Sequence, residues 1–404
     1  MVGNAGGQGG NSVIVRQFNA RVILAALRRL GEASKADLAR QVSLTQNAAG
    51  QIVRDLEEQN LVCMTGKRTG QRGQPATLLC LDPEGAYAIG IKLGRRSLDS
   101  LLIDFTGRVL VSRRHERAFP APDEALRIVL ADIAELRAGL PPARRARLAG
   151  VGLAMPYNLG SWQRELDVPE AVGGAWSRTD FGATLRRNLD LPVFVENDGT
   201  AIAVAELFQG HGREIDDFAV VYIGTAAGGG VVLGGDFRRG VTGNAGDIGM
   251  MPVAPSRLAS AQPPTGGRRD ILLNRASVGT LIRHFRCNDI AVDTGEELDA
   301  AIAAHPALYA EWEADCADAL VDPLLSIGSL LDLQAIVIDG NLPRPCVEAL
   351  LARLRRLLDT HVAEACTPPA LRLGTVGRNA AALGAAILPL HLAYGPDRQL
   401  LFRQ

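Results

Sequence analysis

A glycine-rich stretch between apolar runs, residues 218–252, restricts the possible folds of this chain more than any other segment. Its letters, FAVVYIGTAAGGGVVLGGDFRRGVTGNAGDIGMMP, predict a strand over 218–223, a glycine turn over 224–230 and a second strand over 231–233. β-Branched and apolar runs around clustered glycines are typical of a hairpin. Glycines in such a turn also let backbone N–H groups approach a phosphate closely. A tight turn between two buried strands, without a ligand, is the alternative interpretation.

The length and the distribution of apolar residues set the broad class of the protein. A chain of 404 residues is long enough for two or three domains with cores of their own. No run of about 18 apolar residues occurs, so we expect no membrane helix. Residues 1–14 are glycine-rich and polar, which predicts a flexible arm rather than a signal peptide. We therefore expect a cytoplasmic protein.

The cysteines and histidines are too scattered to predict a metal site. The sequence has six of each, and neither a Cys-x-x-Cys nor a His-x-x-x-His pair occurs. Free cysteines in a reducing compartment and no zinc site of ordinary spacing are the expected outcome.

The first eighty residues are basic, whereas the remainder is acidic. Residues 1–80 carry ten Lys/Arg and five Asp/Glu, so an N-terminal contact with nucleic acid is expected. Apolar spacing predicts helices over 16–30, from Ser34 onward, and over 46–59, with a three-residue turn before the third. This spacing suits a helix-turn-helix. A helical bundle used for dimerisation is the alternative.

A basic hairpin follows the three helices and completes the pattern of a winged helix-turn-helix over residues 15–82. Amide and guanidinium groups near a helix N-terminus can bond base edges in a major groove, and basic hairpin residues can lie along phosphates. The candidate contacts to a double-stranded DNA operator are Thr45, Gln46, Asn47, Gln51, Arg54, Lys67, Arg68 and Arg72.

The body of the chain predicts a mixed α/β fold with two lobes. Strands come first, then helices, then further strands and helices. A strand–glycine–strand pattern at residues 88–94 recurs at 219–225, which indicates two similar halves around a central cleft. Two matches of this length could also arise by chance.

A polar cluster, Glu196-Asn197-Asp198, stands where a strand ends and a helix begins. Side chains at that place point into the crevice where α/β sheets bind ligands. Asp198 is a candidate base for a sugar hydroxyl, and Asn197 is a candidate hydroxyl partner. Capping of the following helix is the alternative role for either residue.

These motifs in this order resemble the ROK family of repressors, open reading frames and sugar kinases. They are Glu196-Asn197-Asp198, Gly224-Thr225-x-x-Gly-Gly-Gly, Gly246-Asp247-Ile248-Gly249 and the winged domain in front. The resemblance implies an actin-like, ribonuclease-H-like two-lobed fold. Lobe 1 would span residues 86–200 and be completed by a C-terminal helix over 379–393, and lobe 2 would span 201–378. Members with a DNA-binding domain include the xylose, glucose and N-acetylglucosamine repressors.

The resemblance also implies a set of ligand-binding residues. Asp198 matches the catalytic Asp of the kinases, so here it would be a vestigial base, and Asn197 matches its sugar-binding neighbour. Asp247 and Asp270 stand where the family has sugar-binding Glu residues. The expected sugar ligands are therefore Asn197, Asp198, Asp247 and Asp270.

Two departures from the family pattern change the expected chemistry. Kinases of the family carry Asp-x-Gly-Gly-Thr in the first hairpin, where this chain has Lys92, Arg95 and Arg96. A lysine replaces the metal-organising carboxylate, so we expect no kinase activity. These cations could bind an anion, but we expect them to be surface charge. Met250 replaces the zinc-site His, and residues 256–269 lack Cys and His, so no zinc or other cofactor is expected.

The leading expectation is a sugar-responsive repressor that binds a palindromic operator as a homodimer or homotetramer. An active ATP-dependent sugar kinase carrying a DNA-binding domain is the first alternative. A regulator with a decayed pocket is the second.

Overall fold

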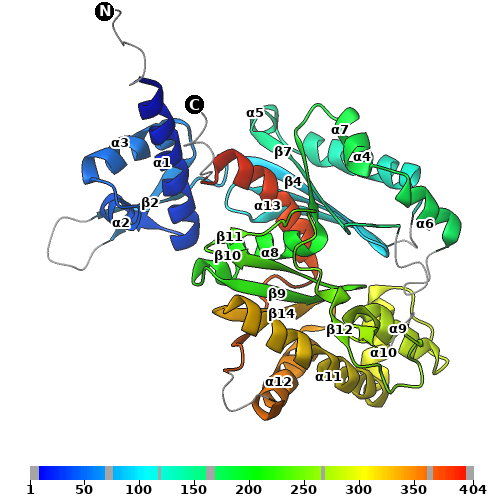
Figure 1. Cartoon of the computed structure of the whole chain (residues 1–404). Helices are drawn as coiled ribbons and strands as arrows, with labels where there is room; N and C mark the ends of the chain where they lie inside the picture. Colours follow the sequence, from blue (N-terminus) through cyan, green and yellow to red (C-terminus); the bar gives the residue numbers. More distant parts are fainter. Residues whose placement is uncertain are drawn as a thin grey trace, which may run out of the picture.

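The computed structural model describes residues 9–68, 76–116, 120–160, 169–264, 269–361 and 367–396. An N-terminal domain stands beside a larger body that contains two five-stranded sheets (Figure 1). No helix within these ranges combines the length and apolar character needed to cross a bilayer.

The N-terminal domain contains three helices and a three-stranded antiparallel sheet in the order β1-β3-β2. Its elements are α1 (Gly9–Leu30), β1 (Ala33–Ser34), α2 (Lys35–Gln41), α3 (Gln46–Glu58), β2 (Val62–Arg68) and β3 (Ala76–Leu81). The helix α1 begins at Gly9, inside the segment expected to be a flexible arm. Once the buried residues Ile23, Leu24 and Leu27 fix the helix, further turns add at little entropic cost.

Side-chain caps set the starts of the second and third helices where the sequence predicts them. Ser34 accepts a hydrogen bond from the backbone N–H of Asp37, and Asp37 accepts one from that of Ser34, which is a capping box. Thr45 accepts from the N–H of Ala48. Ile52, Val53 and Leu56 of α3 pack against α1 in the domain core.

The cysteines inside the described ranges are all free, as expected. Cys63 and Cys80 face each other across β2 and β3, with their sulfur atoms 3.3 Å apart. Cys366 lies outside the described residues.

The sheet of lobe 1 has the order β6-β5-β4-β7-β8, antiparallel from β6 to β4 and parallel from β4 to β8. Its strands are β4 (Tyr87–Leu93), β5 (Ser97–Asp104), β6 (Val109–Glu116), β7 (Leu148–Met155) and β8 (Val193–Asn197). The helices α4 (Pro122–Ala138), α5 (Pro142–Arg145), α6 (Glu170–Ser177) and α7 (Phe181–Arg187) belong to the same lobe (Figure 1).

The sheet of lobe 2 repeats this topology in the order β11-β10-β9-β14-β15. Its strands are β9 (Phe218–Ile223), β10 (Ala227–Leu233), β11 (Asp236–Phe237), β14 (Ala335–Gly340) and β15 (Leu371–Leu373). The outer helices are α9 (Val278–Arg286), α10 (Gly295–Ala304), α11 (Pro306–Leu331) and α12 (Arg344–His361), and a small sheet joins β12 (Pro252–Val253) to β13 (Asp270–Ile271). The internal repeat predicted from the sequence is therefore confirmed.

Two central helices occupy equivalent places after the last strand of each sheet and pack on each other between the lobes (Figure 1). They are α8 (Asp198–Gln209) and α13 (Ala380–Tyr394). The expected lobe boundary at residue 200 thus falls inside α8. A Cβ added to Gly384 of α13 would overlap the carbonyl oxygen of Ala201 in α8, so glycine is required for this close approach.

Strand alternation in β4 turns its smaller residues toward these two helices and its larger residues away from them. In β4, Ile89 and Ile91 pack in the outer core of lobe 1, whereas Ala88 belongs to the central core. Gly90 lies so close to α13 that an added Cβ would overlap its backbone.

The glycines of the second hairpin lie in a strand and not in the turn, which corrects the expected strand boundaries. Gly228, Gly229 and Gly230 pair with Tyr222, Val221 and Val220 in the β9–β10 ladder. A Cβ on Gly230 would stand 2.6 Å from the carbonyl oxygen of Gly199 in α8. Gly230 therefore permits strand–helix contact, and only residues 224–226 form the turn.

Replacing Gly384 with Ala should lower the stability of the body, because the new methyl must push α8 and α13 apart. We expect a loss of about 1–3 kcal/mol in the free energy of unfolding. Thermal or urea denaturation would measure it. The matched control is Gly174→Ala in α6, where an added Cβ meets only Arg178 at 3.5 Å. That variant should be as stable as the wild type or more stable.

Candidate functional site

A cleft of about 400 Å³ lies where both hairpin turns, the start of α8 and the loop before β12 converge. Lobe 1 contributes Lys92, Arg95 and residues 156–158, while lobe 2 contributes the β9–β10 turn and residues 244–250. The cleft is therefore built from equivalent parts of the two repeats. Asn197, Asp198 and Asp247, three of the four expected sugar ligands, line it.

Asn197 caps α8 and also lines the cleft, and binding of a ligand hydroxyl by Asn197 stays a prediction. Its side-chain oxygen accepts hydrogen bonds from the N–H groups of Gly199, at 2.8 Å, and Thr200, so it caps α8. Its amide nitrogen, however, donates to the side-chain oxygen of Asn244 at 3.1 Å. The cap holds Asn197 in place, and its amide group lines the cleft.

Asp198 is the first helical residue of α8, at the floor of the cleft. Burial raises the pKa of its carboxyl above the ordinary range, and the positive charges of Arg95 and Lys92 oppose this rise. One carboxylate oxygen accepts from the N–H of Gly199 at 3.0 Å. A partly buried carboxyl of raised pKa in a cleft is suited to accept a hydrogen bond from a ligand hydroxyl.

Asn244 joins the two halves of the predicted ligand set, although the sequence interpretation missed it. It accepts from Asn197 and donates to the Asp247 carboxylate at 2.8 Å. The available signal was an amide residue among glycines, three positions ahead of Asp247. A second contact fastens the preceding loop, where half-exposed Arg239 forms an ion pair with buried Glu196 at 2.6 Å.

Asp270 does not line the cleft, so the structure separates it from the other three expected ligands. It is buried at the start of β13, where its carboxylate accepts from the side-chain amide of Asn274 at 2.7 Å and from its neighbour's N–H. Because its carboxylate is hydrogen-bonded to neighbouring residues, Asp270 organises the loop after β12. A ligand contact by Asp270 stays a prediction that its position does not support.

The first hairpin turn shows what replaces the carboxylate that the family resemblance implied. The ammonium group of Lys92 lies 3.3 Å from Asp99 on the neighbouring strand and donates to Ser97 at 2.9 Å. A lysine held in this way places a positive charge where a metal would need an oxygen ligand. The residues at this turn therefore do not fit a magnesium–nucleotide site.

We expected Lys92, Arg95 and Arg96 to be surface charges, and for Arg95 this expectation is wrong. Its side chain lines the cleft and the residue is only 8% exposed. The turn between β4 and β5 faces inward at the meeting of the lobes, so a side chain at its apex is enclosed. Burial lowers the pKa of Arg95 to about 10, which leaves it charged at neutral pH.

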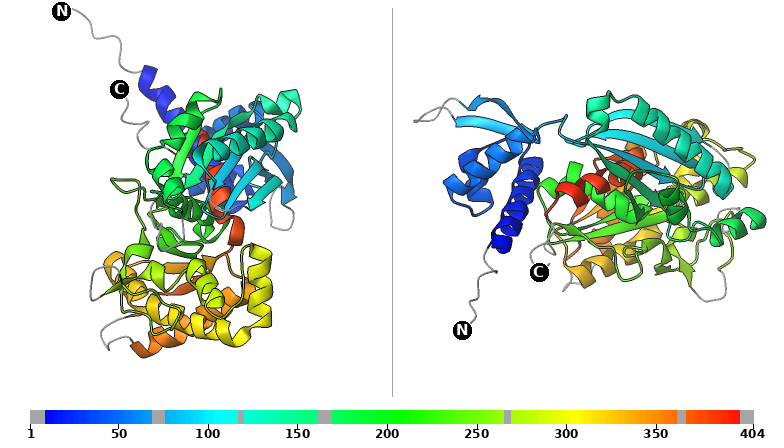
Figure 2. Two further views of the ribbon diagram at one scale, coloured as in Figure 1. Left: turned by 90° about the vertical axis from the view of Figure 1, so that its right-hand side faces the viewer. Right: turned by 90° about the horizontal axis from the view of Figure 1, so that it is seen from above.

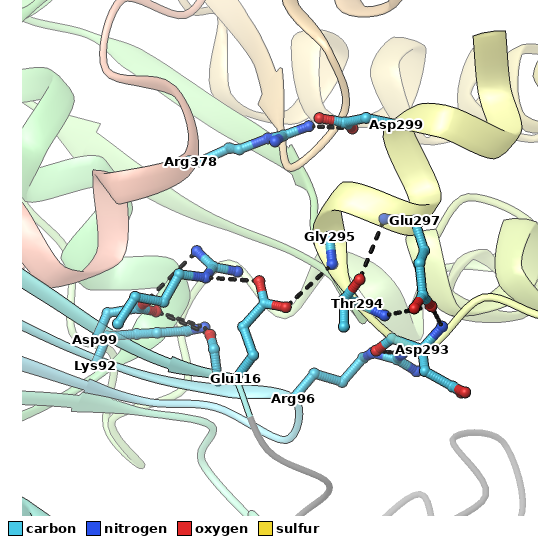
Figure 3. A network of polar contacts seen from close by, with 12 residues as sticks. Lys92, Arg96, Asp99, Glu116, Asp293, Thr294, Gly295, Glu297, Asp299 and Arg378 are labelled. Carbon is cyan, nitrogen blue, oxygen red and sulfur yellow. Dashed lines mark hydrogen bonds and ion pairs between the residues drawn. The ribbon is translucent and has the colours of Figure 1, made fainter.

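Polar contacts bridge the two lobes next to the cleft (Figure 3). Arg96 donates to the backbone oxygen of Asp293 at 2.5 Å, and Glu116 at the end of β6 accepts from the N–H of Gly295 at 3.3 Å. Figure 3 shows these groups from the strands of lobe 1 meeting the N-terminus of α10 in lobe 2. A carboxylate is favoured at a helix N-terminus, so Glu116 helps to hold the lobes together.

Comparison with known proteins identifies the family. A ROK family model matches residues 88–391. The chain belongs to the ROK family.

Relatives of this ROK protein include the uncharacterized protein y4fQ of Sinorhizobium fredii, 26% identical over 89% of this chain and 88% of that protein. The xylose repressor of Bacillus spizizenii is 24% identical over 60% of this chain, and the alignment spans 62% of that repressor.

Among solved structures, a ROK family transcriptional regulator, a homologue of the E. coli MLC protein, has a TM-score of 0.67 at 22% identity. That match covers 97% of this chain and 100% of the regulator. A ROK glucokinase from Streptomyces griseus, bound to glucose and AMPPNP, has a TM-score of 0.59 at 22% identity. That match covers 75% of this chain and 99% of the kinase. These matches show that the fold is shared by regulators and kinases.

The zinc site implied by the family resemblance does not fit the residues of this ROK protein. Met250 lines the cleft and is 44% exposed. Throughout the ranges that the structure describes, no three His, Cys, Asp or Glu side chains are grouped to hold a metal ion. That the protein works without zinc stays a prediction.

Six of the eight predicted DNA contacts are exposed on the N-terminal domain, and this domain lies outside the matched ROK segment. Five of them lie on the third helix or at its N-cap, namely Thr45, Gln46, Asn47, Gln51 and Arg54. Lys67 is exposed on β2, Arg68 ends that strand, and Arg72 lies outside the described residues. Binding of DNA by these residues stays a prediction.

The raised pKa of Asp198 predicts a pH-dependent gain in stability for Asp198→Asn. A group of raised pKa stabilises the folded chain when protonated, and this contribution is lost as the pH rises through the folded-state value. Asn cannot ionise, so the variant should unfold at a higher temperature than the wild type, with a difference that grows from about pH 4 to about pH 8. Exposed Asp236→Asn is the control and should show no such trend. An equal unfolding temperature at every pH would contradict the assignment.

Proposed function

We propose that this protein is a DNA-binding transcriptional regulator of carbohydrate genes, whose actin-like ROK body senses a sugar or sugar-like ligand in the cleft. Residues 15–82 would be a winged helix-turn-helix that binds the operator with α3 in the major groove. The observation that carries the proposal is the path of α8 and α13, which both run from the cleft to the N-terminal domain.

One of these paths is α8. Asp198 at its N-terminus lines the cleft, and Phe208 near its C-terminus contacts α1 of the N-terminal domain. The guanidinium of Arg28 in α1 stands 5.3 Å from the centre of the Phe208 ring and 5.6 Å from that of Phe105. A helix of twelve residues spans roughly 18 Å, so a displacement at Asp198 reaches Arg28 through one stiff element.

The second path is α13. Ala381 lines the cleft, and the carbonyl oxygens of Leu392 and Gly395 accept hydrogen bonds from Arg21 of α1. The views in Figure 2 agree that α1 lies beside the C-terminal end of α13. Each of the two helices therefore lines the cleft at one end and contacts α1 of the proposed DNA-binding domain at the other.

Further contacts fix the N-terminal domain to the body. Arg29 forms an ion pair with Asp216 at 2.7 Å and donates to the carbonyl oxygen of Arg213. In the connection between the domains, the N–H of Asp82 donates a hydrogen bond to the carbonyl oxygen of Leu61. Gly85 is also close to the N-terminal domain, because a Cβ added to it would stand 2.9 Å from the carbonyl oxygen of Asn60. The domain is thus held in one orientation, which a change in the body can alter.

A ligand that bridges the lobes would supply the signal. Asn197 and Asp198 lie where lobe 1 meets α8, whereas Asp247 lies on a loop of lobe 2, so a sugar bound by all three would favour one angle between the lobes. Coupling requires that the ligand bind this arrangement more tightly than the other. In a homodimer or homotetramer the change would alter the spacing of two recognition helices on a palindromic operator.

The names of relatives support a regulator rather than an enzyme. Both a xylose repressor and a ROK transcriptional regulator align with this chain, and the regulator aligns with nearly all of it. The glucokinase shares the fold, but here the ammonium group of Lys92 is held by Asp99 at the turn where a kinase needs to position metal and phosphate. Such a regulator would act in the cytoplasm, without zinc and without turnover of its ligand.

Operator binding and its response to sugars test this proposal. Genomic fragments captured by the purified protein and sequenced should share one palindromic site. Replacing Gln51 and Arg54 together with Ala should weaken binding to that site by about 10- to 100-fold, because base-edge contacts are lost. Gln59→Ala, just beyond the end of α3, is the matched control. Capture of random fragments would contradict the DNA-binding half of the proposal.

The sensor half predicts that a monosaccharide or its derivative changes operator affinity, and that Asp198→Asn removes the change but leaves operator binding intact. Fluorescence anisotropy with a labelled operator would measure both. Phosphorylation of the same sugar from ATP, abolished in Asp198→Asn, would instead establish the kinase. Operator binding with no response to any sugar would indicate a decayed pocket.

The contact between Arg28 of α1 and Phe208 of α8 allows the route of the signal to be tested with variants of Arg28. Arg28→Ala removes the side chain that fills the space beside Phe105 and Phe208, so the effect of sugar on operator affinity should fall by about 0.5–2 kcal/mol. Arg28→Met keeps most of this packing and should retain the response. A full sugar response in Arg28→Ala would show that the signal takes another route.

A further inference from the structure

We infer that the ligand of this cleft is a monosaccharide carrying one anionic group, a phosphate or a carboxylate, and that Arg95 binds that group. The inference rests on the proposed function of the cleft as a sugar site and adds to it the chemical class of the sugar.

Arg95 is a buried cation whose hydrogen bonds are incomplete. One terminal nitrogen donates to the backbone oxygen of Asn158 at 3.0 Å. The Nε atom is buried and has no hydrogen-bond partner among the described residues. The Asp198 carboxylate acts on Arg95 electrostatically, but the two form no ion pair. Burying a guanidinium without a paired anion is costly, and this cost points to a partner that enters the cleft.

The other cations of the cleft are already paired. Lys92 is held by Asp99 and Ser97, and Arg378 forms an ion pair with Asp299 at 2.5 Å (Figure 3). Neither needs a ligand to neutralise it. Of the three cations that line the described cleft, Arg95 is therefore the one left to bind an anion. A guanidinium suits the task because its N–H groups match two oxygens of a carboxylate or phosphate.

The remaining cleft residues determine where the anionic group lies. Asp198 and Asp247 would repel it but can accept hydrogen bonds from hydroxyl groups, and the second N–H of the Asn197 amide can donate to one. The ligand would thus turn its hydroxyls toward these three residues and its anionic group toward the β4–β5 turn. A volume of about 400 Å³ lies within the range of small-molecule sites and accommodates a monosaccharide with one such substituent.

The test compares sugars that differ only in charge. Titration calorimetry of the full-length protein would use glucose, galactose, mannose and N-acetylglucosamine, together with the 6-phosphate and the uronic acid of each. We expect one anionic member to bind about 10- to 100-fold more tightly than its neutral parent. The phosphate and carboxylate arms identify which anion is recognised.

Variants at Arg95 assign the preference to this residue. Arg95→Gln should abolish the difference between the anionic sugar and its neutral parent, while Arg95→Lys should keep part of it. Arg187→Gln is the matched control, since it removes the same charge from an exposed position on α7 of the same lobe and should leave the preference unchanged. Thermal unfolding of each variant checks that it is folded.

The outcomes separate this inference from the proposed function. A neutral sugar that binds as tightly as its anionic derivatives, or an anionic preference that survives in Arg95→Gln, overturns the inference and leaves a sugar-responsive regulator. Binding of inorganic phosphate alone with no added affinity from a sugar also overturns it. If no sugar of either kind binds while the operator does, both the inference and the sensor half of the proposed function fail.

Discussion

The packing of α8 against α13 is the contact on which the remaining structure depends. The two backbones approach so closely that Gly384 can carry no side chain, and Gly90 and Gly152 of lobe 1 are restricted in the same way where their strands meet α13. On the other side, Gly230 allows β10 to touch α8. Backbone contact of this kind is stiff, because interiors at native density transmit displacement instead of absorbing it. It places the cleft and the N-terminal domain at opposite ends of one rigid pair of helices.

Charge in the cleft shows how a fold shared with kinases can hold a different ligand. The ammonium group of Lys92 is neutralised by Asp99 from the neighbouring strand, so the first hairpin turn is closed by the protein's own charges. Arg95, from the same turn, is buried without such a partner. On the opposite side, Asn197, Asn244 and Asp247 form a continuous chain of hydrogen bonds between the lobes. The first hairpin turn therefore lacks the features of a metal–phosphate site, while the opposite side of the cleft presents polar groups.

Several features of the candidate site were predictable because they depend on local chemistry. Asn197 and Asp198 stand at a strand-to-helix junction, and Asp247 follows a glycine loop, so their place at the cleft follows from motif and topology. Asn244 was missed because it bonds to Asn197, which is distant in sequence, and Asp99 because its contact with Lys92 depends on the register of β4 and β5. Asp270 shows the reverse error, since an alignment of residue types cannot tell a side chain that faces a cleft from one that bonds to Asn274.

The sequence by itself determined the helix starts at Ser34 and Thr45, the internal repeat and the ROK family, because caps, periodicity and motifs are local properties of the chain. Tertiary structure decided that Gly230 serves helix packing and that Arg95 is buried. Both depend on how closely two separate segments approach, and this distance is set by the packing of the whole body and is not encoded in any one stretch.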